Sequence, residues 1–547
     1  MDVTTIPILS IITFLPLVGA VILAILPAAY ARPVALVTAL ATWIVSLILL
    51  VGYLPRPGFA YEEVVDWIPA FGIQYKLGVD GLSAALVVLT TTLTWISILA
   101  SFKPIQTRIK EYMISFLVLE VGMLGVFLAL DMFLFYIFWE IVLVPMYLII
   151  GIWGGANRIY ATIKFVLYTL VGSLLMLVAI LATAFTFQAA TGSWQGAFDF
   201  EILRQHAAVG GFAAGLQIAA FLAFFLAFAI KVPMFPFHTW LPDAHTEAPT
   251  AGSVILAAVM LKLGAYGLIR FAIPLYPDAA QTFAPVIIVL SLIGIIYGAI
   301  VALVQPDLKR LVAYSSVSHM GFVSLGIFVF TEQGVQGAIL QMINHGLITG
   351  ALFLLVGVIY ERTHDRTIAK MGGLSARVPV FAAFFGFFVF ASAGLPGLSG
   401  FVGEFLVLVG SFAFDPWVAV IAAFVMVLAA GYLLWMFQRV VFGEVSEFLK
   451  GLGHHLTDMT PTEILTLVPL GVLVVAFGVY PALLLDLIDG SVQDTLRSGA
   501  VGVALEVPPE VILGGFGLLV AGIIARIVFV ALLGRPTTLR PGHEVAR

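Results

Sequence analysis

Long apolar stretches follow one another along the whole chain, separated by short polar connections. Each stretch is close to the roughly 20 apolar residues that a helix needs to cross a bilayer. The longest connections, at about 55–80, 189–212, 443–461 and 489–509, are too short to form a soluble domain. We therefore predict an all-α polytopic membrane protein with about 15 transmembrane helices. The expected spans are approximately 8–27, 33–54, 81–101, 112–130, 132–151, 164–188, 213–247, 250–272, 283–303, 308–329, 336–360, 379–413, 417–442, 462–488 and 510–534.

Two of these spans are unusually long and interrupted. In the span at 213–247, Lys231 is followed by Pro233 and Pro236, neither of which can donate a helical hydrogen bond, so the helix should break within one turn of the lysine. The span at 379–413 contains the glycine-rich and proline-containing stretch 394–400. Broken helices are tolerated in a membrane where the freed backbone is buried in protein or lines a wet cavity.

The two broken helices also suggest an internal repeat. A span with an ionisable residue stands two helices before each of them, Glu140 in the first case and His319 in the second. Five helices separate the two sets, and this odd number predicts that the halves are inverted, as in many transporters. We accordingly divide the chain into three N-terminal helices (1–110), a first repeat (111–272), a second, inverted repeat (273–443) and C-terminal helices (444–547).

Composition agrees with a membrane protein and excludes several chemistries. Hydrophobic residues make up 62% of the chain and charged residues 10%, against about 25% charged in soluble domains. The absence of cysteine excludes disulfides, thiolate nucleophiles, cysteine-ligated iron–sulfur clusters and covalently attached haem. The formal charge of −5 is thinly spread, which argues against nucleic-acid binding. The first apolar stretch follows Asp2 without a basic region, so we expect a retained helix rather than a cleaved signal peptide.

The distribution of basic residues predicts the orientation in the membrane. Connections on the cytoplasmic side carry an excess of lysine and arginine. One set of alternate connections holds Arg32, Lys103, Arg108, Lys110, Arg158, Lys164, Lys309, Arg310, Arg362, Arg366, Lys370, Arg377, Arg439, Lys450, Arg535, Arg540 and Arg547. The other set holds only Arg56, Lys76, Arg204 and Arg497. We therefore expect the chain in the cell inner (plasma) membrane, with its N-terminus outside and its C-terminus cytoplasmic.

Four ionisable residues stand near the centres of apolar spans: Glu140, Lys231, Lys262 and Glu404. A charge at the middle of a membrane helix costs roughly 2.5–3.5 kcal/mol even on insertion scales, so such residues are by default candidates for function. A lysine whose partner can move is able to switch between holding and releasing a proton. We interpret the set as a proton relay; the alternative is a set of structural interhelical pairs.

Other polar residues are weaker candidates for a functional role. His319 and His345 either belong to the relay or satisfy interhelical hydrogen bonds, and no metal-ligand spacing supports a haem or metal site. Arg270 and Arg526 lie near span ends and are expected to be structural. A second tier of candidates, with weaker support for a functional role, contains Glu120, Asp131 (a boundary residue), His238 and His245. These two histidines lie beside Asp243 and Glu247 near a helix end, where we expect either a proton uptake point or a solvated cap.

Several longer motifs are specific enough to be compared with known families. They are Phe138-Trp139-Glu140, Val144-Pro145-Met146-Tyr147, Gly151-Ile152-Trp153-Gly154-Gly155, Lys231-Val232-Pro233-Met234-Phe235-Pro236-Phe237-His238-Thr239-Trp240-Leu241-Pro242-Asp243-Ala244-His245, Ala313-Tyr314-Ser315-Ser316-Val317-Ser318-His319-Met320-Gly321 and Leu395-Pro396-Gly397. Through these motifs the chain resembles the antiporter-like membrane subunits of respiratory complex I (NADH–quinone oxidoreductase), from about residue 75 to 445. Glutamate rather than lysine at position 404 makes the chain resemble one branch of this family, that of subunit M and mitochondrial chain 4.

The resemblance implies fourteen core helices with two inverted five-helix units, so the span at 510–534 is an addition of unknown role. It also implies that Glu140 is paired with Lys231 and that Lys262 is the central relay lysine. His319 and His345 would form a hydrophilic axis that ends at Glu404.

Proton translocation would be coupled to quinone reduction in partner subunits, which would hold NADH, FMN, the iron–sulfur clusters and quinone. This chain would hold no cofactor and no metal, and would contact lipids and neighbouring antiporter-like membrane subunits. The alternatives are the large subunit of a multi-subunit sodium/proton antiporter, the homologous subunit of a ferredoxin-linked or hydrogenase complex, and, more weakly, a haem-carrying electron-transfer subunit.

Overall fold

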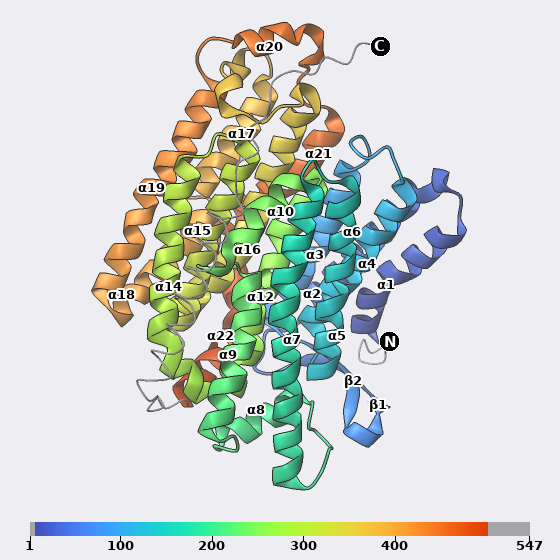
Figure 1. Cartoon of the computed structure of the whole chain (residues 1–547), viewed down its shortest axis with the longest axis vertical. Helices are drawn as coiled ribbons and strands as arrows, with labels where there is room; N and C mark the ends of the chain where they lie inside the picture. The colour runs from blue at the N-terminus through green and yellow to red at the C-terminus, as the bar shows by residue number, and fades with distance from the viewer. Residues whose placement is uncertain (1–5, 502–547) are drawn as a thin grey trace, which may run out of the picture. The chain divides into compact units, whose positions relative to one another are not determined.

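The computed structural model of the protein describes residues 6–501, and these form a bundle of long helices (Figure 1). Thirteen helices in this range are long and apolar enough to cross a membrane. They are α1 (Ile8–Ile25), α2 (Ala31–Gly52), α3 (Gly81–Ala100), α4 (Ile109–Leu128), α5 with α6 (Met132–Ile141 and Leu143–Trp153), α7 (Arg158–Thr191), α9 (Ala214–Lys231), α11 to α13 (Thr250–Leu275), α14 (Pro277–Leu303), α15 (Leu308–Phe328), α16 (Glu332–Thr363), α19 (Pro416–Val441) and α21 (Pro461–Val479). Two shorter apolar helices, α17 (Pro379–Ser392) and α18 (Ser399–Phe414), lie in the predicted broken span.

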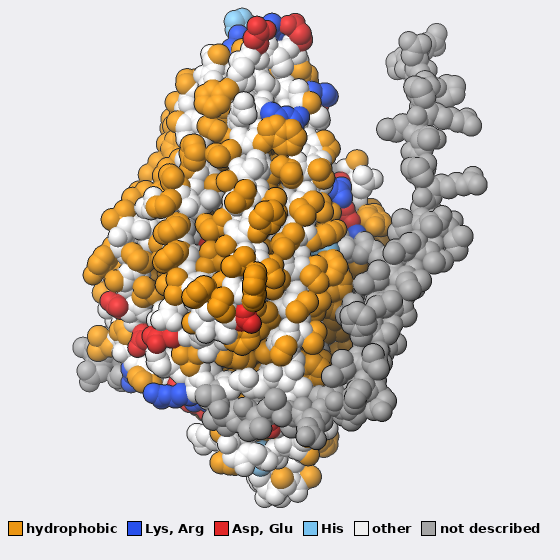
Figure 2. Space-filling model, turned by 90° about the vertical axis from the view of Figure 1, so that its left-hand side faces the viewer, with side chains coloured by type: hydrophobic (Ala, Val, Ile, Leu, Met, Phe, Trp, Pro, Cys, Tyr) orange, Lys and Arg blue, Asp and Glu red, His pale blue; other side chains and the backbone are white. Residues whose placement is uncertain are grey.

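The predicted polytopic helical fold is confirmed, and each of the fourteen spans expected before residue 489 corresponds to helical structure. The fifteenth expected span, at about 510–534, lies outside the described residues, together with Arg526, Arg535, Arg540 and Arg547. Hydrophobic side chains cover the middle of the face shown in Figure 2, and most charged side chains gather toward its upper and lower ends. This distribution is the one expected of a surface in contact with lipid.

Both predicted helix breaks are present. The helix α9 ends at Lys231, and a short turn (Phe237–Trp240) and α10 (Leu241–Glu247) follow after the two prolines. The indole nitrogen of Trp240 donates to the carbonyl of Ile230 at 2.8 Å, which satisfies a backbone group freed by the break. In the second break, the side-chain amide of Asn344 donates to the carbonyl of Ser399 at 2.7 Å.

Two helical segments are wholly enclosed by others. An 18-residue part of the span of α11 to α13 and of α16 is fully buried, whereas most residues in the corresponding parts of α2, α19 and α21 are not buried. Helices that are apolar on all sides belong in such central positions. The enclosed segments carry Lys262 and His345, so the fold buries these two polar side chains inside the protein.

The predicted connections contain more structure than the sequence pattern indicated. The first holds an antiparallel hairpin of β1 (Ala60–Ile68) and β2 (Ile73–Val79), a small departure from an all-α fold. The others hold α8 (Phe200–Ala208) and α20 (Glu447–Gly451).

The expected bounds of the span 462–488 and of the connection after it were wrong. The helix α21 ends at Val479, before Pro481, and a separate helix α22 (Ala482–Val501) follows. Proline at this position cannot continue the hydrogen-bond ladder of α21. The helix α22 buries one face, which carries Leu484, Ile488, Ser491, Val492 and Thr495. This i, i+4, i+7 pattern is that of an amphipathic helix packed on a core.

Connections that were predicted to share a side of the membrane lie together. At one end, Arg32 donates to the carbonyl of Ile105 at 2.8 Å, and Lys110 to that of Ala24 at 2.8 Å. At the other end, Lys76 forms an ion pair with Asp199 at 2.8 Å. The hairpin and α8 therefore occupy the end opposite to α20 (Figure 1).

Candidate functional site

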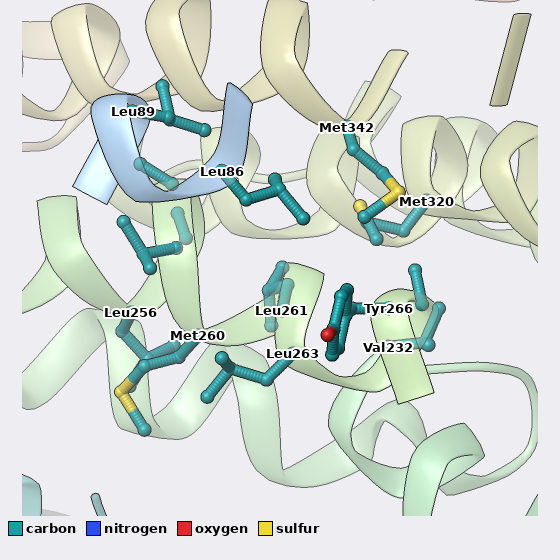
Figure 3. Packing of buried hydrophobic residues seen from close by; sticks show 14 of the residues in the cluster. Leu86, Leu89, Val232, Leu256, Met260, Leu261, Leu263, Tyr266, Met320 and Met342 are labelled. Atoms are coloured by element: carbon teal, nitrogen blue, oxygen red, sulfur yellow. The ribbon is translucent and has the colours of Figure 1, made fainter. Parts of the chain in front are cut away.

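Lys262 lies at the centre of the fully buried span, between two wide, π-helical turns at Leu256–Met260 and Leu268–Ala272. Its side chain is 0% exposed. The ammonium donates to the carbonyl of Ala257 at 2.7 Å and lies 2.7 Å from Nδ1 of His345. Figure 3 shows the apolar side chains packed around the adjacent Leu261 and Leu263, among them Leu86, Val232, Met320 and Met342. A buried charge in such surroundings needs polar partners, and the carbonyl and the imidazole supply them.

A second pair of ionisable residues adjoins the first. Nδ1 of His319, on α15, lies 2.6 Å from Oε1 of Glu404, on α18. The side-chain amide of Gln341 donates to the same carboxylate oxygen at 2.9 Å. The imidazole rings of His319 and His345 are 5.9 Å apart between centroids. Lys262, His345, His319 and Glu404 thus form one row of buried polar groups.

A small cavity lies beside this row, at the second helix break. Its lining includes His319, Gln341, His345, Ser392 and Glu404. Nε2 of His319 has only long contacts, at 3.4 Å to Ser392 and 3.5 Å to Tyr432. Nε2 of His345 has no hydrogen-bond partner among the described residues. The cavity has room for about one water molecule with several polar neighbours, and such a water would connect the two imidazoles.

Lys231 and Glu140 lie apart from this row. The ammonium of Lys231 is buried against aromatic rings, 5.2 Å from the centroid of Trp139 and 5.9 Å from that of Phe165. Glu140 is half-buried, and within residues 6–501 its Oε1 has no hydrogen-bond partner. The charge of Glu140 acts on Lys231, but no direct ion pair joins the two side chains in the described part of the chain. The close pair that the resemblance implied is therefore not formed in this structure.

The second-tier residues have different outcomes. Asp131 caps α5, since it accepts from the backbone of Phe133 and Leu134, and is the boundary residue that was expected. Glu120 is fully buried in α4, and neither of its oxygens has a hydrogen-bond partner within the described range. His238 and His245 are 2% and 0% exposed, so the solvated cap was wrong. These rings instead pack against aromatic residues, His238 against Tyr297 and His245 against Phe353.

The structure adds residues that the sequence analysis did not select. Gln341 stands four residues before His345 on the same helix face, a spacing that was visible in the sequence. Tyr432 approaches His319 from α19, and no local signal distinguishes it from other tyrosines. Asp80, which was also not selected, forms a buried ion pair at 2.5 Å with Arg270, the arginine that was expected to be structural.

The helical fold, the two discontinuous helices and the buried row of ionisable groups together define an antiporter-like membrane protein. Residues 129–430, more than half of the chain, match the family model described as NADH:quinone oxidoreductase/Mrp antiporter, TM. The chain belongs to this family, within the branch of NADH–quinone oxidoreductase subunit M and chain 4.

Two named relatives each match 90% of the chain. The NADH-quinone oxidoreductase subunit M of Rhodobacter capsulatus is 51% identical over 502 residues, which are 90% of this chain and 96% of the relative. The NADH-ubiquinone oxidoreductase chain 4 of Marchantia polymorpha is 43% identical over 496 residues, 90% of this chain and 97% of the relative.

Two solved structures share the fold. A chain of respiratory complex I from Thermus thermophilus with bound NADH superposes with a TM-score of 0.80 at 32% identity, and the match covers 90% of this chain and 99% of that one. A chain of the Mrp complex from Dietzia sp. DQ12-45-1b gives a TM-score of 0.77 at 23% identity, covering 98% of this chain and 58% of that one. The second likeness concerns the fold alone.

Proposed function

We propose that this chain is the proton-translocating membrane subunit of an NADH–quinone oxidoreductase, in which it works beside other membrane subunits. Family membership and the likeness to a complex I chain support this function. The likeness to the Mrp chain is limited to the fold and adds no second function. Moving one proton against the membrane potential requires about 2.3 kcal/mol per 100 mV, and this free energy comes from quinone reduction in partner subunits.

The proton path runs from Lys262 through His345 and His319 to Glu404. The observation that carries this assignment is the continuity of the row, with contacts of 2.7 Å at one end and 2.6 Å at the other. The cavity that both histidines line bridges the gap between them. Histidine suits this role because its charge changes near neutral pH. Gln341 and Ser392 orient the carboxylate and the imidazole.

Lys231 and Glu140 act as the switch for this path. In the present state Glu140 is not in direct contact with Lys231, so the lysine charge is neutralised only from a distance. An unpaired positive charge on Lys231 weakens the hold of the next lysine on its proton, whereas pairing with Glu140 restores it. Movement of Glu140 toward and away from Lys231 would thus alternately load and unload Lys262.

The proposal also covers the cofactors, the two repeats and the orientation of the chain in the membrane. The chain is a non-redox subunit, and FMN, iron–sulfur clusters and the NADH and quinone sites lie in its partners. Among residues 6–501 there is no group of three or more His, Asp or Glu side chains that would hold a metal ion. The repeats at 111–272 and 273–443 each supply one discontinuous helix. The end that carries α20 faces the cytoplasm, and the hairpin and the N-terminus face outward.

The relay is tested by substitution in the assembled complex. We expect Lys262→Ala and Lys231→Ala to lower coupled NADH–quinone activity and proton uptake by about tenfold or more, while native gels show normal assembly. Lys450→Ala, in an exposed ion pair with Glu447, is the matched control and should retain full activity. Full proton pumping by an assembled Lys262→Ala complex would overturn the assignment.

A further inference from the structure

A cluster of buried polar residues lies along the Lys262 helix in the direction of the hairpin end. Tyr266 follows Lys262 by four residues, so the two side chains project from the same face of the helix. Nε of Arg270 lies 3.2 Å from the hydroxyl of Tyr266, and its guanidinium pairs with Asp80. Tyr266, Arg270 and Asp80 are 0%, 6% and 4% exposed. The relay described above uses none of them.

The hydroxyl of Tyr266 has all of its hydrogen-bonding positions occupied. It donates to the carbonyl of Phe127 at 2.9 Å and accepts from Arg270. Its second lone pair faces the hydroxyl of Ser83 at 3.3 Å. A guanidinium has five donors, no acceptor, and stays protonated in proteins. A backbone carbonyl cannot take up a proton at this acidity either. The tyrosine is therefore unable to accept a proton on one side and release one on the other.

Arg270 is held in this position by segments that are distant in the chain. Asp80 caps α3 by accepting from the backbone of Ser83, and it also accepts from Ser491 of α22 at 2.7 Å. The guanidinium lies 4.8 Å from the ring centroid of Phe59, which precedes the hairpin. A buried ion pair is weak support for stability, because desolvation offsets most of the attraction. Stability therefore does not explain why the guanidinium of Arg270 is held in a position from which it donates to the hydroxyl of Tyr266.

The two ends of the Lys262 helix differ in polarity. At the end that begins with Thr250, the helix borders a pocket of about 370 Å³ whose lining includes Lys103, Glu361 and Glu463. This pocket also contains the last turn of α3, whereas Asp80 stands at its first turn. One end of the helix thus meets a pocket with ionisable side chains in its lining, and the other meets a donor that cannot relay protons.

We propose that Asp80, Arg270 and Tyr266 form a proton-tight seal, which prevents a proton on Lys262 from leaking toward the hairpin end. The seal rests on the proposed function, since it presupposes that Lys262 holds the transported proton. It makes the exit through His345 and Glu404 obligatory. Arg270 and Asp80 are positioning residues that act through the hydroxyl of Tyr266.

The seal is tested by passive proton flux into proteoliposomes that contain the whole complex, without NADH. A potassium diffusion potential drives protons inward, and a trapped pH-sensitive dye reports them. The double variant Arg270→Met with Asp80→Asn frees the tyrosine hydroxyl without leaving an unpaired charge. We expect its flux to rise about tenfold, the rate change that one lost hydrogen bond produces.

Adding Tyr266→Phe to the double variant should return the flux to the parental value, because it removes the hydroxyl that the double variant frees. General loosening of the packing would not be reversed by this third change. The matched control, Arg362→Met with Glu463→Gln, removes the buried ion pair at the other end and should leave the flux unchanged. Unchanged flux in the assembled double variant, or no reversal by Tyr266→Phe, would overturn the seal.

A second pair of variants covers the case in which the double variant does not assemble. Tyr266→His introduces a ring that can take up and release a proton and should raise the flux, whereas Tyr266→Phe alone should not. Equal flux in these two variants would also overturn the proposal. Failure of the seal is distinguishable from failure of the proposed function, because the latter is decided by NADH-driven pumping in Lys262→Ala.

Discussion

The ammonium of Lys262 lies 2.7 Å from Nδ1 of His345, although 83 residues separate them in the chain. With the lysine as donor, the imidazole must accept at Nδ1 and therefore carries its hydrogen on Nε2. Nε2 has no hydrogen-bond partner in the described residues, and His345 lines the cavity that His319 also lines. The contact with Lys262 thus sets the tautomer of the imidazole of His345. It also leaves the N–H at Nε2 as the group that is available for a further hydrogen bond.

Replacing His345 should interrupt the row without removing Lys262. His345→Phe keeps the ring volume but provides neither acceptor nor donor, so we expect coupled activity to fall by about tenfold or more. NADH-driven acidification of inverted vesicles is the measurement. Met342→Leu, a substitution of similar volume on the same helix, is the control. A His345→Phe complex that pumps at the parental rate would contradict the path.

Glu404 should require its acidic proton and not only its hydrogen bonds. Glu404→Gln retains an oxygen that can accept from His319 or Gln341, but the amide cannot bind and release a proton at neutral pH. We expect a loss as large as that of His345→Phe, measured by the same assay. Gln341→Leu removes one donor to the carboxylate, a bond of about 1.5–3 kcal/mol, and should leave partial activity. Equal activity in these two variants would refute the distinction.

Trp139 should stabilise the charged form of Lys231. A desolvated cation over an indole ring is worth about 2 kcal/mol, and the ring centroid lies 5.2 Å from the ammonium. Trp139→Leu should reduce coupled activity less than Lys231→Ala does, and Trp139→Phe should restore most of it because a ring remains. The measurement is the coupled activity of the three variants, which should rise in the order Lys231→Ala, Trp139→Leu, Trp139→Phe. Parental activity in Trp139→Leu would show that the ring has no such role.

Arg362 should contribute to the stability of the end that carries α20 and not to proton transfer. Its guanidinium makes two bonds to Glu463, at 2.8 Å each, and further bonds to the carbonyls of Thr457, Asp458 and Val358. Breaking such a buried pair costs about 3–5 kcal/mol, so Arg362→Met should lower the thermal midpoint measured in detergent. The exposed Lys450→Met should not change it. Loss of pumping without loss of stability would argue against this role.

At neutral pH and above, the ion pair cluster at the hairpin should depend on pH only in the alkaline range where Lys76 loses its proton. Burial alone would lower the pKa of Lys76, but its hydrogen bonds to Asp199 and Glu201 outweigh this and raise the pKa above 10.5. A raised pKa means that the stabilisation is complete below 10.5 and is lost only as the pH rises through the shifted value.

An alkaline-active protease should therefore cut residues 57–80 slowly, and at a nearly constant rate, from pH 8 to 10. Lys76→Gln should be cut faster throughout this range, because Asp199 and Glu201 then face each other without a counter-charge. A rise in the parental cleavage rate between pH 8 and 9 would contradict the direction of the shift.

Local chemistry made part of this structure predictable. Pro233 and Pro236 predicted the first break, because neither can donate a helical hydrogen bond and each ring clashes with the preceding turn. The central position of Lys262 in an apolar span was sufficient to select it. In contrast, the separation of Glu140 from Lys231 depends on how α5 and α9 pack. The burial of His245 under Phe353 depends on α16, which no local pattern near residue 245 contains.

The wide turns on either side of Lys262 make the length of its helix as important as its side chains. A π-helical turn holds one more residue than an α-helical turn, so the extra residue is accommodated within the turn itself. Deleting a single alanine from 256–260 would therefore restore regular geometry and leave the direction of Lys262 nearly unchanged. Deleting one residue from the regular stretch Thr250–Ile255 would instead rotate Lys262 by about 100° relative to Thr250. The place of a one-residue deletion that changes no charge thus decides whether the path stays connected.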